Sequence, residues 1–485
     1  MKLENILKLP FANQIEKLCV DTLTGRDPKA YREEYNGKRE RRETSVDKRQ
    51  DKPIPVYSAT EKDKDGNPVK VGEDYIPVAR IRTNAPKRIV RTASAFLFGG
   101  EMKVELPEAN EATEYFKDQW TERLKMKSVL AEFARTVMIE TKSALLFYPR
   151  ISVDDTGTGV KSIGVMVLNA NNSDFYPHFD EYGNMDAFTR KYVVQDEQGK
   201  EQNCVWIQTA NTTYVGTETS GAWSVSSEAN LAGKITVVYA EQDATEWEDV
   251  AGNMDALEMR LSRLIDTNDY FGDPILKSYG QSSLPTKETV GKTLEFDIYS
   301  DPETGKDIHG DAEYLVWQQS IDSIKLEIEE MRKEIHAGTS TPDISFESLK
   351  GMNNISGIGM KFMFLDAHIK AIEKMEIFGP AVIRCISVVK SMISNITETK
   401  HKTTLATSNI KVTFGSILPD DLKEMVDILV AANGNKPLNS QETATSLSPF
   451  TKDTQEEMRK LNSEADAESS RNSLIGTVVE TPTAE

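Results

Sequence analysis

The sequence predicts an α+β fold in which helices and strands occupy separate stretches of the chain. Large aliphatic residues recur at alternating steps of three and four over 320–337 and again from 355 onward, which is typical of amphipathic helices. Between 143 and 250 the pattern changes to short runs such as SALLFYPRI and KITVVYA, rich in β-branched and aromatic residues. Gly, Asn and Asp bound these runs, so a β-rich region with helical regions on either side is expected.

Residues 1–55 are predicted to form a short amphipathic helix followed by an arm of mixed charge. We interpret the arm as solvated, with phosphate binding as the alternative. Its basic residues are Lys38, Arg39, Arg41, Arg42, Lys48, Arg49 and Lys52.

Residues 56–252 are predicted to be helical at first and β-rich later. Helices are expected over 81–98 and 111–139, and Gly99-Gly100 ends the first of them. A strand-like MKVEL follows the two glycines, and the β-rich part begins at 143.

Two further helices are predicted to enclose a small α/β insertion. The first covers 253–270, with Asn253 as its N-cap. The insertion, 271–319, is interrupted by Gly and Pro, and its segments TLEFDIY and AEYLVW are expected to form a strand pair around SDPETGKDIHGD. The second helix covers 320–337, and one stripe of it is expected to pack through Ile321, Ile324, Ile328, Met331 and Ile335.

A polar loop, 338–354, separates this helix from another helical stretch, 355–398. The helical period continues there in Ile358, Phe362, Leu365, Ile369 and Ile372, so rigid helices are predicted to hold both ends of the loop. The strand-like NIKVTFG follows within 399–419, and helices are expected at 420–432 and 452–468. The tail, 469–485, is rich in Ser, Thr and Glu and is predicted to be disordered.

The charge of the chain narrows its possible functions. With 58 Lys and Arg against 77 Asp and Glu, the formal net charge is −19, which argues against a protein that grips nucleic acid by neutralising phosphates. A surface past which a polyanion slides remains compatible with this charge, because every fixed Lys or Arg contact to phosphate adds friction. We find no run long enough to cross a bilayer and no secretory signal, so a cytoplasm-like compartment is expected.

The motifs that would indicate a catalytic or metal site fail on spacing. Counted from Asp301, a calcium loop needs Gly at its sixth position and Glu at its twelfth, where this chain has Lys306 and Ala312. No phosphate-binding loop, dinucleotide fingerprint or HExxH motif is present, and Cys19, Cys204 and Cys385 are too far apart in sequence to suggest a metal site. We therefore predict no enzyme activity, no metal and no cofactor.

Several short motifs occur in a characteristic order between about residues 80 and 465. They are Asn84 to Gly99 (NAPKRIVRTASAFLFG), Asp174-Phe-Tyr176-Pro177 with Phe188-Thr-Arg190-Lys-Tyr192, Leu264-Ile265-Asp266-Thr-Asn268, Pro342-Asp343-Ile-Ser345-Phe-Glu347 with Ser356-Gly357, and Gln441-Glu442-Thr443 with the acidic 453–464. Their order and spacing resemble the portal proteins of tailed bacteriophages, the head-to-tail connector family of long-tailed phages. Two departures are the absence of a proline after Gly233 and the presence of Gly359 where the family usually has Ala.

The resemblance implies a structural protein of the virion, assembled in the host cytoplasm as a homo-oligomeric ring, dodecameric in the family, at one capsid vertex. Double-stranded DNA would pass through the channel without sequence-specific contacts. The implied partners are the large subunit of terminase, a head-completion or adaptor protein, and the major capsid and scaffolding proteins. The alternative is another ring or vertex protein of the virion that does not conduct DNA, and a metal-dependent nuclease is a more distant alternative.

The same resemblance divides the chain into the named regions of a portal-like fold. These are a wing (56–252), two stem helices (253–270 and 320–337), a clip (271–319), a tunnel loop (338–354), a long helix toward the crown (355–398), a strand returning to the wing (399–419) and crown helices (420–468). A stem helix of 18 residues would span about 27 Å. The clip residues expected to dock partners are Asp297, Asp301, Glu303, Asp307, Asp311 and Glu313.

The tunnel loop is expected to face the DNA. Lys350 is its only Lys or Arg, and we interpret it as a transient phosphate contact, the alternative being an exposed lysine with no role. The candidate loop residues are Ser340, Asp343, Ser345, Glu347, Lys350, Asn353 and Asn354.

Overall fold

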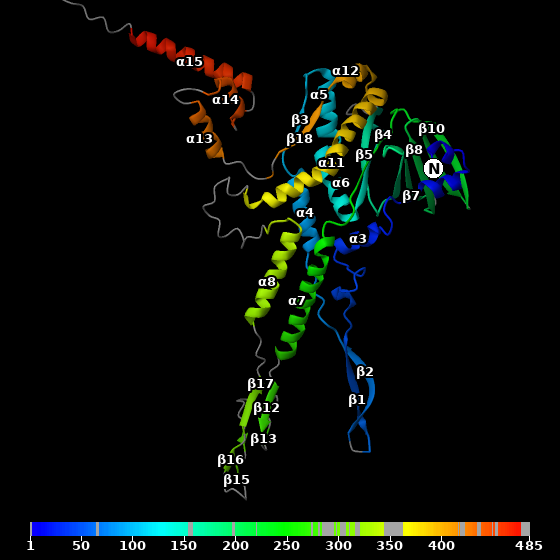
Figure 1. Cartoon of the computed structure of the whole chain (residues 1–485), viewed down its shortest axis with the longest axis vertical. Helices are drawn as coiled ribbons and strands as arrows, with labels where there is room; N and C mark the ends of the chain where they lie inside the picture. Colours follow the sequence, from blue (N-terminus) through cyan, green and yellow to red (C-terminus); the bar gives the residue numbers. More distant parts are fainter. Residues whose placement is uncertain are drawn as a thin grey trace, which may run out of the picture. The chain divides into compact units, whose positions relative to one another are not determined.

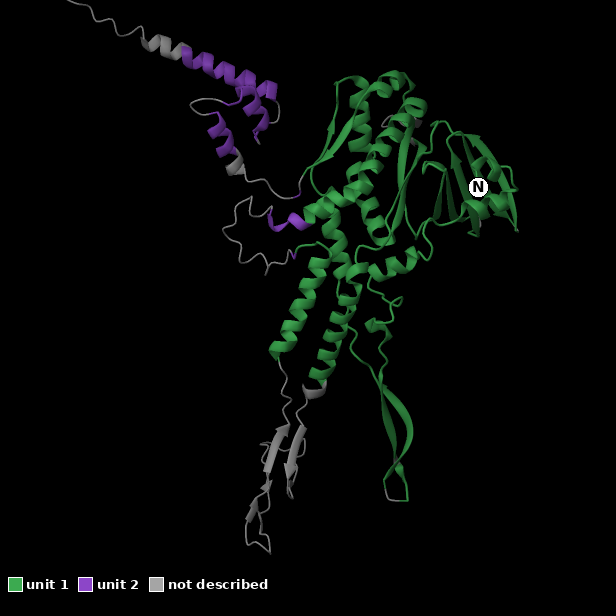
Figure 2. Cartoon of the chain, viewed as in Figure 1, with its two compact units in different colours: residues 1–342, 367–415 green, residues 343–366, 416–485 purple. Residues whose placement is uncertain are grey.

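The structure, a computed structural model, describes residues 2–64, 67–153, 159–195, 199–219, 221–272, 275–279, 282–283, 295–296, 298–300, 307–309, 311–315, 321–343, 362–415, 417, 422–433, 438–448, 450–451 and 454–476. These residues form helices and several small antiparallel sheets, so the predicted α+β class is confirmed. The chain divides into two compact units, Met1–Pro342 with Ala367–Gly415 and Asp343–Asp366 with Ser416–Glu485 (Figure 2).

Two antiparallel sheets form the β-rich part of the first unit, where the sequence predicts strands (Figure 1). The larger has the order β10-β9-β8-β7-β6, with bounds Ala222–Ala229, Thr212–Thr219, Glu201–Thr209, Met185–Gln195 and Asp174–Phe179. The smaller has the order β11-β4-β5, with bounds Val237–Glu241, Lys142–Val153 and Gly159–Leu168.

The smaller sheet lies between two hydrophobic cores because side chains alternate across a strand. Leu145 and Phe147 of β4 belong to the main core, which contains the helices. Ala144 and Leu146 belong to a second core, which they share with Phe175 and other residues of the larger sheet. Both faces of β4 are therefore buried over residues 142–147, which explains the nearly continuous apolar run there.

Helices α1 (Leu3–Ile6) and α2 (Phe11–Leu18) pack on the larger sheet, consistent with the predicted amphipathic start. Ile6 and Leu18 pack in one cluster with Val205 and Ile207 of β8. A Cβ atom on Gly216 would lie 2.2 Å from the ring of Phe11, so this strand position must remain glycine for α2 to approach.

The main core is formed by α4 (Ala85–Phe98), α5 (Glu111–Asp118), α6 (Met126–Glu140) and α11 (Leu365–Met392). The single helix predicted over 111–139 is wrong, because a π turn at Gln119–Arg123 separates α5 from α6. Lys125 then adopts a left-handed conformation with φ 49°, which redirects the chain into α6. Phe116 and Trp120 stack on one another across this break and are fully buried.

Helix α11 differs from its predicted packing. Together with the following π turn, Leu365–Thr397 is long and apolar enough to cross a bilayer by length and composition, so the expectation that no such run exists was wrong. Much of the helix lies in the core of the first unit, however, through residues such as Phe378, Cys385 and Val389. Its N-terminal part shows the opposite of the predicted stripe: Lys370 is buried, whereas Leu365, Ile369 and Ile372 are exposed. Phe362, which precedes the helix, is exposed as well.

A strand from late in the chain returns to the first unit. β18 (Lys411–Phe414), within the predicted NIKVTFG, pairs antiparallel with β3 (Met102–Glu105), within the predicted MKVEL. The amide of Gly415 donates to the carbonyl of Glu101 over 2.8 Å. A Cβ atom on Gly100 would lie 1.7 Å from the carbonyl oxygen of Gly415, so the glycine permits this close approach. Helix α12 (Lys402–Thr407) immediately precedes β18.

The second unit contains three helices among its described residues, α13 (Leu422–Ala432), α14 (Gln441–Leu447) and α15 (Thr454–Gly476). Ser440 caps α14 by accepting a hydrogen bond from the amide of Thr443. Helix α15 continues to Gly476, so residues 469–476, predicted to belong to a disordered tail, are helical. Arg471 and Leu474 in this stretch have good helix propensity, and adding residues to an existing helix avoids the cost of a new nucleus.

The predicted charged arm is bound to helix α7 (Ala251–Gly272), which corrects its interpretation as a solvated segment. Arg39 is fully buried, with Nη2 2.9 Å from Glu258 Oε1 and Nη1 3.7 Å from Asp255 Oδ1. Arg42 donates through Nε to Asp255 over 2.9 Å. Arg49 Nη2 lies 2.5 Å from Asp266 Oδ2, which extends the contact by two further helical turns.

The segment before α4 also lies along α7, and this explains why α4 begins at Ala85 instead of 81. The amides of Ala79, Ile81 and Thr83 donate to the side chains of Asp266, Ser262 and Glu258 respectively. These alternate amides point to one side, as in an extended strand, so residues 79–83 cannot be helical at the same time. We call residues 39–49 and 79–83 together the α7 strap.

Between the two parts of the strap lies a long β-hairpin that the sequence analysis missed. β1 (Lys52–Lys62) pairs antiparallel with β2 (Pro68–Ile76), and neither belongs to a larger sheet. Figure 1 shows this hairpin projecting from the first unit on the side to which α7 also points.

We expect Arg39→Met to destabilise the protein by about 3–5 kcal/mol, because it leaves the buried carboxylate of Glu258 without its cation and leaves Asp255 with Arg42 alone. The measurement is the free energy of unfolding from a urea titration followed by circular dichroism. Arg123→Met is the matched control: Arg123 pairs with Asp118 on the surface, and its loss should cost about 1 kcal/mol or less. Equal losses for the two variants would contradict the structural role of the strap.

Candidate functional site

The predicted stem corresponds to two helices that pack side by side, α7 and α8 (Ile321–Gly338) (Figure 1). Arg260 of α7 and Glu327 of α8 form an ion pair of 2.8 Å between them. Both side chains are more than one third exposed, so the pair contributes little to stability. The main association is apolar, through Leu257 and Leu261 of α7 in the same core as residues of α8.

The predicted packing stripe of α8 is buried only toward its C-terminal end. Ile335 is 4% exposed, and Ile328 and Met331 are partly buried against the main core. Ile324 is half-buried, but Ile321 is 71% exposed, and the neighbouring Leu326 is also exposed. A single copy of the chain therefore covers only part of this stripe.

The predicted clip lies at the far ends of α7 and α8, and its strand pairing differs from the prediction. β17 (Asp311–Leu315) pairs with β12 (Ile275–Tyr279), not with a strand of TLEFDIY. The latter segment contributes β14 (Glu295–Phe296) and β15 (Ile298–Ser300), which pair with β13 (Ser282–Ser283) and β16 (Asp307–His309). β12 follows α7 and β17 precedes α8. The side-by-side packing of the two helices therefore brings these two strands together.

Three of the six predicted docking residues fall in described strands of the clip. Asp307 begins β16, and Asp311 and Glu313 lie in β17, opposite Tyr279 and Lys277. Asp297, Asp301 and Glu303 lie outside the described residues.

The chain leaves α8 toward the predicted tunnel loop through a tightly bonded turn, residues 336–341, which we call the loop root. The hydroxyl of Thr339 donates to the carbonyl of Ile335 over 2.7 Å, and the Thr339 and Thr341 hydroxyls lie 2.6 Å apart. His336 Nδ1 donates to the carbonyl of Thr341 over 3.0 Å. Ser340 has φ 49°, an uncommon conformation for a residue other than glycine, which these bonds maintain.

Helix α11, which follows the loop, fixes the loop root from the other side. Lys370 Nζ donates to the carbonyl of Thr339 over 2.6 Å and also contacts Glu246 Oε1 at 2.7 Å. Lys374 Nζ lies 2.8 Å from Glu246 Oε2 and donates to Gln242. One buried lysine thus connects the start of the loop, the following helix and the segment before α7.

Glu246 remains ionised in this cluster at neutral pH. Burial favours a higher pKa for Glu246, but the two ammonium groups of Lys370 and Lys374 outweigh burial and hold the pKa below its usual range. Because the pKa of Glu246 is lower in the folded state than in the unfolded one, the stabilisation that ionised Glu246 gives to the folded protein is fully present above the unfolded pKa. It is lost as the pH falls through the folded pKa.

The candidate loop residues are only partly placed. Ser340 belongs to the loop root, and Asp343 follows it as the first residue of the second unit. Ser345, Glu347, Lys350, Asn353 and Asn354 lie outside the described residues. Sequence reasoning missed Lys370 and Glu246, because helical periodicity highlights apolar residues and says nothing of a buried lysine.

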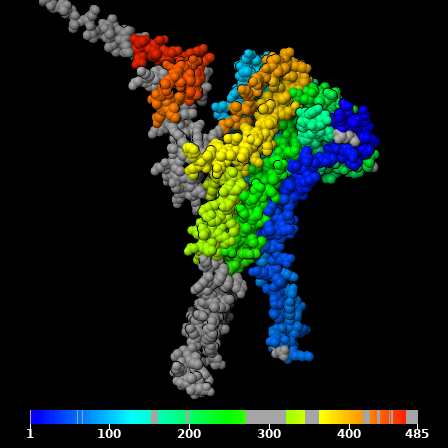
Figure 3. Space-filling model, viewed as in Figure 1, coloured from blue at the N-terminus to red at the C-terminus, as the bar shows by residue number. Residues whose placement is uncertain are grey.

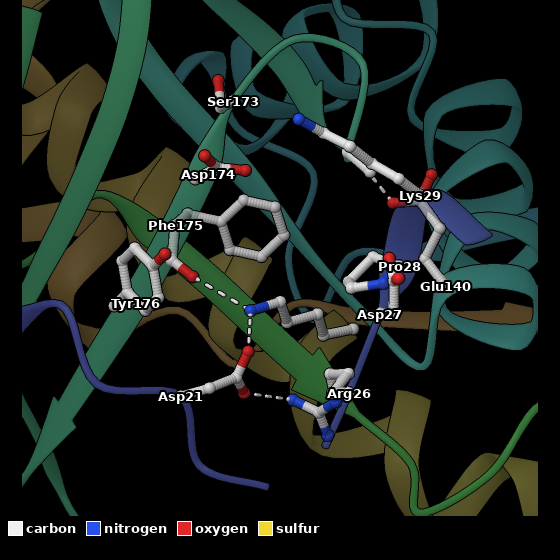
Figure 4. A pocket seen from close by; sticks show the side chains of 12 residues that line it. Asp21, Arg26, Asp27, Pro28, Lys29, Glu140, Ser173, Asp174, Phe175 and Tyr176 are labelled. Carbon is white, nitrogen blue, oxygen red and sulfur yellow. Dashed lines mark hydrogen bonds and ion pairs between the residues drawn. The ribbon is translucent and has the colours of Figure 1, made fainter. Parts of the chain in front are cut away.

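A polar cavity of about 220 Å³ lies beside α3 (Pro28–Tyr35), at the start of β4 and β6 (Figure 4). Its charges are largely paired within the chain: Lys142 with Asp21, Arg26 with Asp21 and Glu241, and Glu140 with Arg32. Burial raises the pKa of Tyr176, which lines the cavity, to about 12. This pairing attaches the N-terminal segment to the smaller sheet, and we assign the cavity a structural role.

We expect Lys370→Met to accelerate amide hydrogen exchange at Ser340 and Thr341 by about tenfold or more, because one charge-assisted hydrogen bond to the loop root is removed. Exchange can be followed by mass spectrometry on peptides that cover 335–343. Lys374→Met is the matched control, since Lys374 shares Glu246 but has no bond to Thr339 among its described contacts. Equal exchange at the loop root in the two variants would contradict the role given to Lys370.

Comparison with known proteins identifies the family. A family model described as "Phage portal protein, SPP1 Gp6-like" matches residues 30–471, which includes the α7 strap, helices α7 and α8, the loop root and most of the second unit. A search of curated proteins found no match. The matched region covers nearly the whole chain, and the chain therefore belongs to the SPP1 Gp6-like family of phage portal proteins.

Proposed function

We propose that this chain forms a ring at one vertex of the phage capsid and that double-stranded DNA passes through the ring during genome packaging and ejection. The ring is dodecameric in this proposal. It docks the large terminase subunit during packaging and a head-completion or adaptor protein afterwards, and it contacts the major capsid and scaffolding proteins. Family membership carries the proposal, because portal proteins are structural components of the virion and not catalysts.

The arrangement of α7 and α8 supports this function. The two helices lie side by side and connect the body of the first unit to the predicted clip (Figure 1). The apolar stripe of α8 is left partly exposed toward Ile321, and neighbouring subunits of a ring would cover it. The charged residues of α8, including Glu329, Glu330 and Glu334, would then face solvent in the assembly.

The loop root supports a channel loop with a fixed base. Lys370 holds the carbonyl of Thr339, so displacement of the loop between α8 and α11 would not readily unwind the end of α8. A loop that contacts moving DNA needs such a base, because the force on its tip must be transmitted to rigid elements. The net charge of −19 is compatible with this arrangement, since an acidic protein keeps its contacts with a polyanion weak.

The ring itself is tested by electron microscopy of the purified protein. We expect twelve-fold rings with a central channel wide enough for a B-form duplex, together with a molar mass from light scattering that matches twelve chains. Closed particles without such a channel would support the alternative, a virion ring or vertex protein that does not conduct DNA. A monomer at all concentrations would contradict both.

The channel role of the loop is tested with Lys350→Glu in an in-vitro packaging assay. We expect a lower packaging yield, because the substitution removes the one cation of the loop and adds repulsion toward phosphate. Lys103→Glu, the same change of charge at an exposed position of β3, is the control and should package normally. An unchanged yield for Lys350→Glu would overturn the assignment of Lys350 as a DNA contact.

A further inference from the structure

The β1–β2 hairpin exposes an unusual number of large apolar side chains. Six of them are between 37% and 59% exposed: Ile54, Val56, Tyr57, Val71, Tyr75 and Ile76. The register pairs Pro53 with Tyr75 and Ile54 with Asp74, so Ile54, Val56 and Ile76 lie on one face. Tyr57 and Tyr75 lie on the other. Figure 3 shows the hairpin as a projecting arm, in blue. The exposed fractions leave apolar side chains on both of its faces in contact with solvent.

Such an arm is not expected to be stable alone. An isolated two-stranded hairpin is marginally stable at best in water and normally needs a further strand or an apolar surface against one face. Among the described residues of this chain, none covers the six apolar side chains. A surface of another molecule would complete the hairpin.

The composition of the hairpin favours packing through its faces over extension of its sheet. Pro53 and Pro55 lie in β1 and lack an amide hydrogen. Proline in a strand is confined to edges because it cannot donate to a neighbouring strand, so the free edge of β1 is a poor template for pairing. The apolar side chains, in contrast, are available on both faces.

The base of the hairpin is fixed against α7. Asp51 accepts hydrogen bonds from the amide of Val78 over 3.1 Å and from Arg80 over 2.9 Å, which joins the two strands at their base. Arg80 also donates to the carbonyl of Arg49 over 2.6 Å. Arg49 and the amide of Ala79 both bind Asp266, near the end of α7. The hairpin is therefore attached to the stem through a defined joint.

The same chain carries a second incomplete apolar surface, on the stem. Ile321 and Leu326 of α8 and Ile265 of α7 are exposed. The hairpin and the stem surface remain exposed in one copy, so neither covers the other within the chain. A ring is built from a heterologous interface, in which one patch of each subunit meets a different patch of the next. The hairpin and the stem surface are two such patches.

We propose that the β1–β2 hairpin is a clasp that packs against the α7–α8 stem of the adjacent copy of this chain. The inference rests on the proposed ring, because only there does each copy have a neighbour on a fixed side. The hairpin contributes Tyr57, Val71 and Tyr75 as its principal contacts, and the stem receives them with the exposed part of the α8 stripe.

The contact is tested by photo-crosslinking in assembled rings. A benzophenone side chain is introduced at position Tyr57 or Tyr75, and rings are assembled from equal amounts of ¹⁴N- and ¹⁵N-labelled chains. We expect crosslinked peptides of mixed isotope composition that join the hairpin to 251–272 or 321–338. Crosslinks of uniform isotope composition only, or intact rings without any crosslink to the stem, would overturn the clasp while leaving the ring in place.

A second measurement uses the variant Tyr57→Glu with Tyr75→Glu. We expect the protein concentration needed for half-assembly, measured by mass photometry, to rise at least tenfold, while the melting temperature of the monomer is retained. Thr60→Glu is the matched control, because it adds a charge to the same hairpin without removing an apolar side chain. Unchanged assembly of the double variant would overturn the clasp, and failure of the unmodified protein to form rings would overturn the proposed function as well.

Discussion

The buried carboxylates of α7 impose the constraint on which the arrangement of the first unit depends. Asp255 and Glu258 are almost fully buried, and two charges in such a place require a cation and hydrogen-bond donors. Arg39 supplies the cation, and the amide and hydroxyl of Thr83 bind Glu258 at 2.5 and 2.7 Å. The α7 strap must therefore run along the helix, and the positions of the hairpin base and of the start of α4 follow from that path.

The parts of the fold that sequence analysis predicts are those fixed by local periodicity. The strands of the two sheets and the C-terminal part of helix α8 have apolar patterns that match their burial. In β4, alternate side chains enter two different cores. The β1–β2 hairpin was missed because its apolar residues alternate with prolines and charges and are not buried in one chain. The break before α6 depends on one left-handed residue, Lys125, whose type gives no signal for it.

In the candidate site, too, features set by local periodicity could be predicted and features set by distant contacts could not. The helix before the loop could be found from its stripe, but the residue that holds the loop root, Lys370, could not. A buried lysine is paired with a partner far away in sequence, here Glu246, and a single sequence contains no record of such pairing. The exposure of apolar residues of α11 could not be predicted for a related reason. Periodicity identifies an apolar face but does not indicate which surface it packs against, or whether that surface belongs to the same chain.

The pairing of β18 with β3 affects the order in which the protein can be made. The hydrogen-bonded pair Thr413 and Glu105 is separated by 308 residues, so the edge strand β3 stays open until the ribosome has synthesised most of the chain. Contacts of such high sequence separation form late and slowly, since the entropy of closing the intervening chain must be overcome first. A nascent chain would consequently have its two sheets and the α7–α8 pair before it has a closed core. A chain that ends before β18 would leave the edge of β3 unpaired and would lack Val412 and Phe414, which pack against the main core.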